Sequence, residues 1–224
     1  MTREFAVDTS LTLYTYWRSS AAYRVRIGLN LKGLAYAMVP VHLVRDGGQQ
    51  HAPEYAALNP QQRVPTLRHG ERVLTQSLAI LEYLEETHPQ PPLLPADAAG
   101  RARVRALAQL VACDIHPLNN LRVLQFFDRE WNVPQAERDD WVLHWIREGF
   151  AAMEAMLAAS PDTGRFCHGD APGLADCCLL PQMYNARRFS LDLAPFPILR
   201  RIEEACLALP AFDAARPENQ PDAA

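Results

Sequence analysis

The sequence lacks a long apolar run: none reaches the roughly 20 residues that a membrane-spanning helix needs, and residues 1–8 lack the apolar core of a signal peptide. It also lacks an excess of basic residues, because 22 lysines and arginines face 26 acidic residues and leave a net charge of −4. Such a chain has no general attraction for nucleic acid or for an acidic membrane surface. We therefore expect a cytoplasmic protein with neither nucleic-acid nor membrane partners, in which any anion is bound locally.

Cysteine is scarce: the chain has five, and their spacing matches neither a disulfide framework nor a zinc site. We expect reduced thiols, most of them buried in the core, and no bound metal. The overall composition is 49% hydrophobic and 21% charged over 224 residues, as in an ordinary globular protein. The length suits one large domain or two small ones.

Patterns typical of strands and helices alternate in the first third of the chain. β-forming residues alternate over residues 11–16, and a helical composition follows as far as Gly33, a good C-terminal cap. Pro40 lacks a backbone donor and so favours an edge position for its strand. The predicted strands cover 11–16, 36–41, 64–67 and 72–75, and the predicted helices 20–32, 53–58 and 77–86. This β-α-β-α-β-β-α order indicates a first domain over residues 9–88.

A cluster of prolines interrupts this pattern and cannot continue a helix, so we assign residues 89–96 to an extended linker. Beyond it, apolar residues recur only at helical spacing, which predicts an all-α domain over residues 97–213. The predicted helices of this domain cover 97–127, 134–159, 172–190 and 197–209. Residues 214–224 are small, polar and proline-containing, and we expect them to form a mobile tail.

The most distinctive motif follows the first predicted strand. Arg18, Ser19 and Ser20 stand at the start of a predicted helix, with Arg24 and Arg26 in its first turns. A hydroxyl and the positive end of a helix dipole can together bind an anion or lower the pKa of a thiol. Simple N-capping by a serine explains the same residues. The motif alone leaves both roles open.

Four ordered blocks together resemble the zeta class of glutathione transferases. The blocks are residues 18–27, 59–67, 76–80 and 114–121. The resemblance runs from about residue 11 to residue 210. It implies an α+β two-domain fold, the glutathione transferase fold, with an N-terminal thioredoxin-like domain and a C-terminal all-α helical domain. It also implies glutathione as the cofactor and a homodimer.

In the zeta class the first serine of the signature faces the sulfur of glutathione, and by resemblance this is the role of Ser19. Where the class often has a cysteine, this chain has Ala21, so the protein has no thiol of its own at that point. The residues that the resemblance places at the glutathione site are Ser19, Ser20, Ala21, Ala22, Tyr23, Arg24, Gln50, Val64, Gln76, Ser77, His116, Asn120, Leu121 and Arg122.

Three of these assignments also make statements about local structure. By resemblance, Val64-Pro65 is the cis-proline turn on which an extended peptide docks, although the local sequence alone favours an ordinary trans proline. Ser77 is placed as the N-cap of the next helix, where its N–H and hydroxyl suit a carboxylate. His116 and Asn120 are four residues apart, so they share one face of a predicted helix that Pro117 kinks.

Arginines indicate the substrate, because guanidinium groups pair bidentately with carboxylates. By resemblance, Arg18 and Arg188 grip the carboxylates of a small dicarboxylate substrate and, with Ser19, form the catalytic set. Arg187 has an equally good role at a helix C-terminus. Asp176 looks like the buried capping aspartate of the family's sixth helix. Gly173 replaces the threonine or serine that usually precedes this aspartate, and the helix is expected to tolerate glycine there.

The activity implied by the resemblance is glutathione-dependent cis-trans isomerisation of maleylacetoacetate to fumarylacetoacetate, a step of tyrosine and phenylalanine catabolism, with some transferase side activity. Isomerisation of the shorter diacid maleylpyruvate is an open alternative. We expect such an enzyme to have an arginine at the position of Leu121, so leucine favours maleylacetoacetate. A transferase acting on small halogenated acids is a third interpretation. A non-catalytic binding module would need a degraded serine signature, and the signature is intact.

Overall fold

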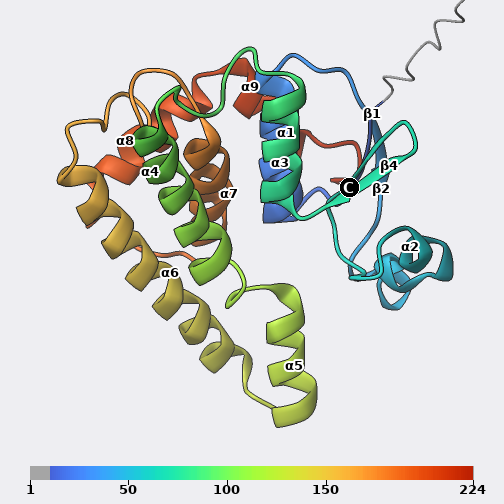
Figure 1. The fold of residues 1–224 in the computed structure, drawn as a ribbon. Helices are drawn as coiled ribbons and strands as arrows, with labels where there is room; N and C mark the ends of the chain where they lie inside the picture. Colours follow the sequence, from blue (N-terminus) through green and yellow to red (C-terminus); the bar gives the residue numbers. More distant parts are fainter. Residues whose placement is uncertain (1–10, 224) are drawn as a thin grey trace, which may run out of the picture. The chain divides into compact units, whose positions relative to one another are not determined.

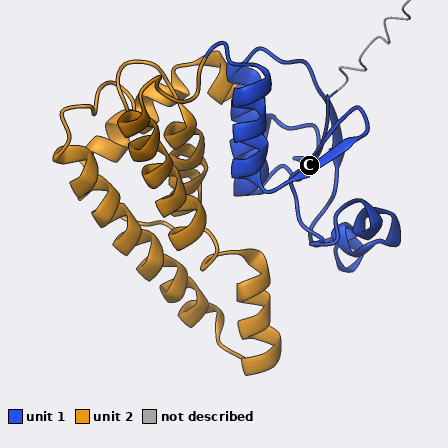
Figure 2. Cartoon of the chain, viewed as in Figure 1, with its two compact units in different colours: residues 1–91, 214–224 blue, residues 92–213 orange. Residues whose placement is uncertain are grey.

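The structure, a computed structural model, describes residues 11–223, which fall into two compact units (Figure 2). Of the described residues, unit 1 comprises 11–91 together with 214–223, and unit 2 comprises 92–213. The boundary lies between Pro91 and Pro92, inside the proline-rich stretch that we assigned to a linker. The start that we expected for the first domain, at residue 9, lies outside the described residues.

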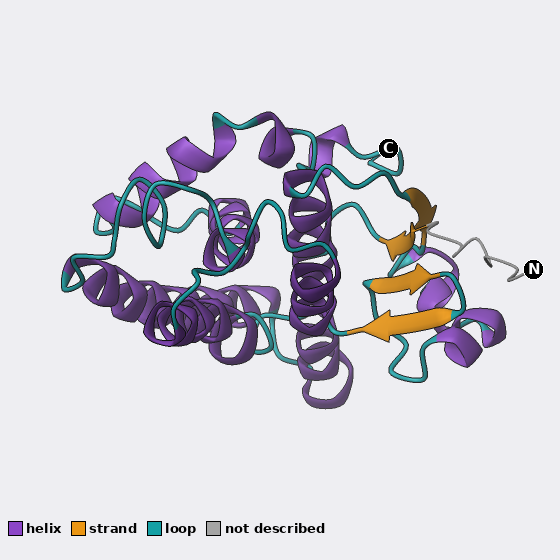
Figure 3. Ribbon diagram, turned by 45° about the horizontal axis from the view of Figure 1, so that its top comes forward, coloured by secondary structure: helices purple, strands orange, loops and turns teal. Residues whose placement is uncertain are grey.

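Unit 1 is built around a four-stranded sheet of order β2-β1-β3-β4 (Figures 1 and 3). β1 pairs parallel with β2 and antiparallel with β3, and β3 pairs antiparallel with β4. The strands are β1 (Leu11–Thr15), β2 (Ala37–Pro40), β3 (Thr66–His69) and β4 (Arg72–Thr75). Pro40 therefore lies in an edge strand, as its missing N–H predicted.

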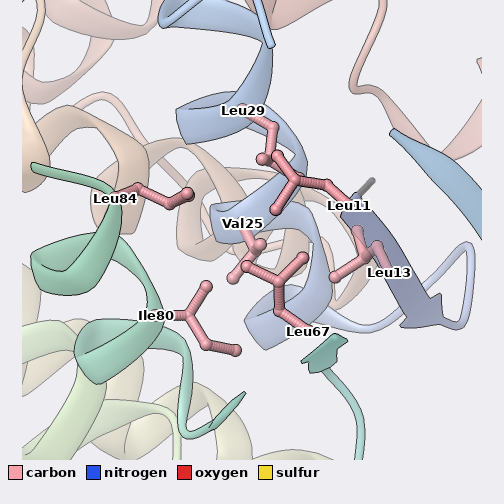
Figure 4. Packing of buried hydrophobic residues seen from close by; sticks show 7 residues of the cluster. All are labelled: Leu11, Leu13, Val25, Leu29, Leu67, Ile80 and Leu84. Carbon is pink, nitrogen blue, oxygen red and sulfur yellow. The ribbon is translucent and has the colours of Figure 1, made fainter. Parts of the chain in front are cut away.

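Three helices complete the order β1-α1-β2-α2-β3-β4-α3 in unit 1, which confirms the predicted sequence of elements. They are α1 (Ser20–Leu31), α2 (Pro53–Leu58) and α3 (Ser77–Thr87), with 3-10 turns η1 (Arg45–Gly47), η2 (Gln49–His51) and η4 (Pro217–Asn219). Figure 4 shows α1 and α3 packing on the sheet through Leu13, Val25, Leu67 and Ile80, all fully buried. Each such side chain stabilises the fold by about 1.5–3 kcal/mol. This packing holds both helices against the sheet.

The described part of unit 2 contains helices and no strand (Figure 3). Its helices are α4 (Ala98–Gln109), the π-helical turn η3 (Leu110–Ile115), α5 (Leu121–Trp131), α6 (Gln135–Ala158), α7 (Leu174–Arg188), α8 (Pro197–Leu207) and α9 (Pro210–Asp213). α4 packs against α7, and α6 against α8. Among residues 11–223, no helix is long and apolar enough to cross a membrane.

The single helix predicted over 97–127 is wrong, because the chain leaves the helix after Ile115 and starts a new one at Leu121. Pro117 has no N–H to continue the ladder. Packing also contributes: a Cβ added at Gly149 in α6 would lie 2.3 Å from the Ile115 side chain. Ile115 therefore occupies the space above this glycine and fixes the π-helical turn against α6.

The expectation of a mobile tail at 214–224 is also wrong for the residues that the structure describes. Residues 214–223 pack into unit 1, where Ala215 is fully buried. The Arg26 guanidinium, itself fully buried, donates to the Ala215 carbonyl at 3.1 Å. A buried cation needs acceptors, and the main-chain carbonyl of this segment supplies one. A short polar segment can thus be held without an apolar pattern of its own.

The five cysteines are free thiols, as predicted. Four are buried and Cys113 is exposed. Burial raises the pKa of the Cys167 and Cys206 thiols, which keeps them protonated and unreactive.

Candidate active site

Ser19 lies at the N-terminus of α1, separated from β1 by the loop of residues 16–18. It is the N-cap of this helix, and its Oγ accepts a hydrogen bond from the Ala22 N–H at 3.2 Å. In this bond the hydroxyl oxygen accepts, so the hydroxyl hydrogen is still able to donate. The first turn of α1 contains no acidic residue that would oppose the helix dipole. N-capping and binding of a thiolate are therefore compatible roles for Ser19, while Ser20 is the first residue of the helix.

The loop before Ser19 is held by buried cationic contacts. Arg26 donates to the carbonyls of Tyr16 at 3.3 Å and Trp17 at 2.8 Å. The Ser19 N–H also donates to the Tyr16 carbonyl, at 3.0 Å. Arg18 is exposed, and its guanidinium lies 5.2 Å from the centre of the Trp17 ring. Burial lowers the pKa of Arg26 to about 10, which still leaves this residue cationic at neutral pH.

Two of the predicted residues, Arg24 of α1 and Ser77 of α3, meet inside unit 1. The Arg24 Nη1 donates to the Ser77 Oγ at 3.2 Å, and both side chains are buried. The first turn of α3 has no acidic residue. A guanidinium beside a helix N-terminus makes this corner suited to a carboxylate. Tyr23 is buried as well, and the Arg26 guanidinium lies 5.3 Å from the centre of its ring.

The assignment of Ser77 as an N-cap is wrong. Gln76 occupies the N-cap with φ 67° and ψ 115°, and Ser77 is the first residue of α3. The Gln76 side chain donates to the Gln61 amide oxygen at 2.8 Å, which links it to the loop before β3. The Ser77 N–H is consequently one of the N-terminal helix donors that have no partner within the helix.

Gln50 and Val64 both belong to unit 1: Gln50 lies in η2 and Val64 in the segment before β3. The Gln50 Nε2 donates to the Leu43 carbonyl at 3.4 Å, while its Oε1 is buried and has no partner among the described residues. An unpaired buried acceptor is costly, by about 1–3 kcal/mol, and a ligand N–H would satisfy it. Val64 is buried just before β3, and the Val64–Pro65 peptide bond is cis, as the resemblance implied.

In unit 2, His116 and Asn120 do not share a helix face, contrary to prediction. His116 follows the π-helical turn and donates its N–H to the Val111 carbonyl at 2.9 Å. Asn120 is the N-cap of α5, and its Oδ1 accepts from the Arg122 N–H at 3.2 Å. Leu121 and Arg122 are exposed in the first turn of α5. The predicted residues therefore surround the junction between two helices.

Asn119 is a candidate that sequence reasoning missed. Its side chain is buried, and neither its Oδ1 nor its Nδ2 has a hydrogen-bond partner in the part of the chain that the structure describes. The signal was the Asn-Asn doublet, of which we chose only the second member. Because Asn120 uses its oxygen to cap α5, Asn119 is the member whose amide remains to be satisfied.

The two arginines at the end of α7 have different surroundings. Arg187 forms an ion pair with Glu203 of α8 through bonds of 2.9 and 2.5 Å. This pairing raises the pKa of Arg187. Arg188 is exposed, within 3.3 Å of the Asn185 Oδ1 and 5.1 Å from the centre of the Phe189 ring. Arg187 is thus paired with a carboxylate of the fold, whereas Arg188 donates a hydrogen bond to the neutral amide of Asn185, which makes Arg188 the better candidate for a substrate carboxylate.

Asp176 caps the start of α7 from inside unit 2, as predicted. It is fully buried and accepts from the Cys167 N–H at 2.9 Å and the Gly173 N–H at 2.8 Å. Burial raises the pKa of its carboxyl group, against the opposing effect of these hydrogen bonds. A Cβ at Gly173 would lie 2.7 Å from the Leu93 carbonyl oxygen, so glycine is required by this close approach.

The predicted site residues form two groups, each described within its own unit. Residues 18–24, 50, 64 and 76–77 lie in unit 1, and residues 116–122 and 188 in unit 2. Over residues 11–223, no group of three or more histidine, cysteine, aspartate or glutamate side chains could hold a metal ion.

Comparison with known proteins relates this arrangement to one family. Residues 13–92 match the family described as "Glutathione S-transferase, N-terminal domain". The chain is 52% identical over 96% of its length, and 99% of the relative's, to a Vibrio cholerae protein named "Probable maleylacetoacetate isomerase".

Two solved structures are also similar. A bacterial zeta-class glutathione transferase, maleyl pyruvate isomerase in its holo form, has a TM-score of 0.92 and 50% identity, covering 95% of this chain and 100% of that one. Maleylacetoacetate isomerase from Methylobacterium extorquens AM1, with bound malonate and GSH, has a TM-score of 0.91 and 46% identity, covering 95% of this chain and 99% of that one.

Proposed function

Because the chain belongs to the zeta class of the glutathione transferase family, we propose that it catalyses the glutathione-dependent cis-trans isomerisation of maleylacetoacetate to fumarylacetoacetate. The observation that carries this proposal is Ser19, an N-cap whose hydroxyl can still donate, at a helix N-terminus without acidic residues. Ala21 replaces the cysteine common in the class, so the nucleophilic sulfur has to come from the cofactor.

The residues of unit 1 fit glutathione. The Arg24–Ser77 corner suits the γ-glutamyl carboxylate, with the Gln76 backbone turning the chain into α3. The buried Gln50 Oε1 suits an N–H of the tripeptide, and the main chain of Val64 suits its cysteinyl unit, as an added strand. Ser20, Ala22 and Tyr23 belong to the first turn of α1, next to Ser19. In unit 2 we assign His116, Asn120, Leu121 and Arg122 to the same cofactor.

The reaction needs a thiolate and two cationic groups that bind the carboxylates of the diacid. When bound, glutathione supplies the thiolate that adds to the cis double bond and leaves again after rotation about the resulting single bond. Ser19 donates a hydrogen bond to that sulfur, and with the α1 dipole lowers its pKa. A fall of two pKa units corresponds to about 2.7 kcal/mol, within reach of one charge-assisted hydrogen bond and a dipole. Arg18 and Arg188 bind the two carboxylates and stabilise the negative charge that develops on the substrate.

Maleylpyruvate is the competing substrate, since an isomerase of that diacid is also about half identical to the chain. Leu121 favours maleylacetoacetate, because an arginine there would offer a further cation to the shorter diacid. The test compares kcat/KM for both diacids in the natural protein and in Leu121→Arg. We expect maleylacetoacetate to be preferred and the preference to shift toward maleylpyruvate in the variant. A natural preference for maleylpyruvate would contradict the assignment of substrate.

We place the reaction in tyrosine and phenylalanine catabolism, in the cytoplasm, and assign the protein a homodimeric state and a glutathione transferase side activity. The membership of the zeta class supports these assignments. Light scattering tests the dimer, which has twice the 25.2 kDa mass of the chain; a monomeric mass would refute it.

A further inference from the structure

Both main-chain polar groups of Trp17 are held by residues from outside its loop. The Trp17 N–H donates to the Asp222 Oδ2 at 3.0 Å, across 205 residues of sequence. The Trp17 carbonyl accepts from the Arg26 Nη2 at 2.8 Å. The two peptide groups that flank Trp17 are therefore each held from outside the loop, the Tyr16–Trp17 group by Asp222 and the Trp17–Arg18 group by Arg26.

Asp222 belongs to a C-terminal segment that is itself anchored in unit 1. The Arg26 Nε donates to the Ala215 carbonyl at 3.1 Å, so one guanidinium bonds both the loop and the segment. The buried Gln220 side chain donates to the carbonyls of Ala214 at 2.9 Å and Arg216 at 2.7 Å, which fixes the turn before Asp222. Asp222 also attracts the Arg26 cation electrostatically. The carboxylate is thus held close to the start of α1.

Trp17 directly precedes the two residues to which we assign chemistry. Its ring lies under the Arg18 guanidinium, 5.2 Å from it. The Ser19 N–H donates to the Tyr16 carbonyl, which also accepts from Arg26. The Tyr16–Trp17 peptide group thus donates to Asp222 and accepts from Ser19, so a shift of this group would move Arg18 and Ser19 together.

We propose that Asp222 is a positioning residue of the active site: through the Trp17 N–H, the C-terminal segment fixes the loop that carries Arg18 and Ser19. This inference rests on the proposed function, because it assigns Ser19 to the glutathione sulfur. A displacement of even a fraction of an ångström weakens a hydrogen bond to a thiolate, since such bonds are short and directional.

The test compares Asp222→Ala and Asp222→Asn in the full chain. Asparagine keeps an oxygen that can accept from Trp17, whereas alanine removes it. Glu218→Ala is the matched control, because Glu218 lies in the same segment and its ion pair, with Arg216, is at 3.6 Å and exposed. The main readout is the ultraviolet absorbance of the thiolate of bound glutathione as a function of pH. A second readout is kcat and KM with maleylacetoacetate, and thermal unfolding reports the folded fraction.

In Asp222→Ala we expect the pKa of bound glutathione to rise by about half a unit and kcat/KM to fall about fivefold, as for the loss of one hydrogen bond. Asp222→Asn should recover most of both, and Glu218→Ala should match the natural protein. An unchanged thiolate titration in folded Asp222→Ala would overturn the inference, as would equal losses in the alanine and asparagine variants. If the natural protein ionises glutathione without isomerising the diacid, the proposed function is refuted. The thiolate titration of the variants then still tests whether Asp222 positions the loop.

Discussion

Ser19 combines two roles in a single hydroxyl. Its oxygen caps α1 by accepting from the Ala22 N–H at 3.2 Å, and we assign its hydrogen to the glutathione sulfur. A substitution that removes the hydroxyl removes both roles, so the two have to be separated by the choice of replacement. Glycine serves this purpose, because it is almost as good an N-cap as serine, whereas alanine is a poor one.

We predict that Ser19→Ala lowers isomerisation at least about tenfold, equivalent to about 1.4 kcal/mol of lost transition-state stabilisation, while glutathione still binds. The same change should lower the free energy of unfolding by about 1 kcal/mol through the lost cap. Ser19→Gly should lose as much activity with only a few tenths of a kcal/mol of stability. Steady-state kinetics and urea unfolding check both variants. Natural activity in Ser19→Gly would reduce Ser19 to a capping residue.

Arg187 and Arg188 are neighbours with opposite roles, which makes them a matched pair. Arg188→Ala should raise the KM of the diacid about tenfold, as expected for the loss of a charge-assisted hydrogen bond, and leave that of glutathione nearly unchanged. Arg187→Ala should leave both KM values unchanged. It should instead cost about 1–2 kcal/mol of stability, because it leaves the buried Glu203 carboxylate without its cation; the half-exposed arginine keeps this figure low. An equal rise of both KM values in Arg188→Ala would show that this residue does not bind a carboxylate of the diacid.

At the scale of elements, the start of α7 depends on a glycine. The Leu174 N–H donates to the Leu93 carbonyl at 2.8 Å, and the same oxygen would lie 2.7 Å from a Cβ at residue 173. The serine or threonine that usually stands here in the family would collide with this carbonyl. The glycine at residue 173, which departs from the family pattern, is therefore needed for the backbone of residues 92–96 to pass close to the start of α7 before it continues into α4.

We predict that Gly173→Ala lowers the free energy of unfolding by about 1–3 kcal/mol, the usual cost of overpacking. The expected cause is displacement of the Leu93 carbonyl and loss of its bond to Leu174. Urea unfolding of the variant measures this cost. A variant as stable as the natural protein would show that the chain around Leu93 adjusts freely, contrary to the account of this contact.

The elements that the sequence predicts well are those whose signal is local. The strands of unit 1 and helices α1, α6, α7 and α8 carry their own apolar period, and the edge position of β2 follows from Pro40 alone. At the break after Ile115 the sequence predicted only a kink at Pro117, because it does not show that Ile115 packs against Gly149 of another helix. Ser77 was misplaced by one residue because Gln76 adopts a positive φ, which is uncommon for a residue other than glycine.

For the candidate site, the sequence named segments but could not show the hydrogen-bond partners or burial of each side chain. Spacing gave no reason to consider Asn119 beside Asn120, since only the structure shows that Asn120 caps α5 while the buried Asn119 amide has no partner among the described residues. Likewise, nothing local distinguishes Arg187 from Arg188 until Glu203 is placed beside the former. Partners from distant elements decide these cases.

At the scale of the whole molecule, the C-terminal segment, residues 214–223, packs with unit 1 although the helices of unit 2 separate the two in sequence. This packing was not predictable from composition, because it relies on the buried Arg26 and on main-chain carbonyls rather than on apolar side chains. As a result, Asp222 lies beside the loop that carries Ser19 and accepts a hydrogen bond from it.

The central claim is that the protein is an isomerase that borrows the sulfur of glutathione and returns it. The most direct measurement follows maleylacetoacetate by absorbance with glutathione present at a small fraction of the substrate concentration, while free thiol is assayed in parallel. The account predicts complete conversion to fumarylacetoacetate with no loss of free thiol, and no conversion when glutathione is omitted. Conversion that stops when glutathione is exhausted, with one thiol consumed per substrate, would contradict it and indicate a transferase.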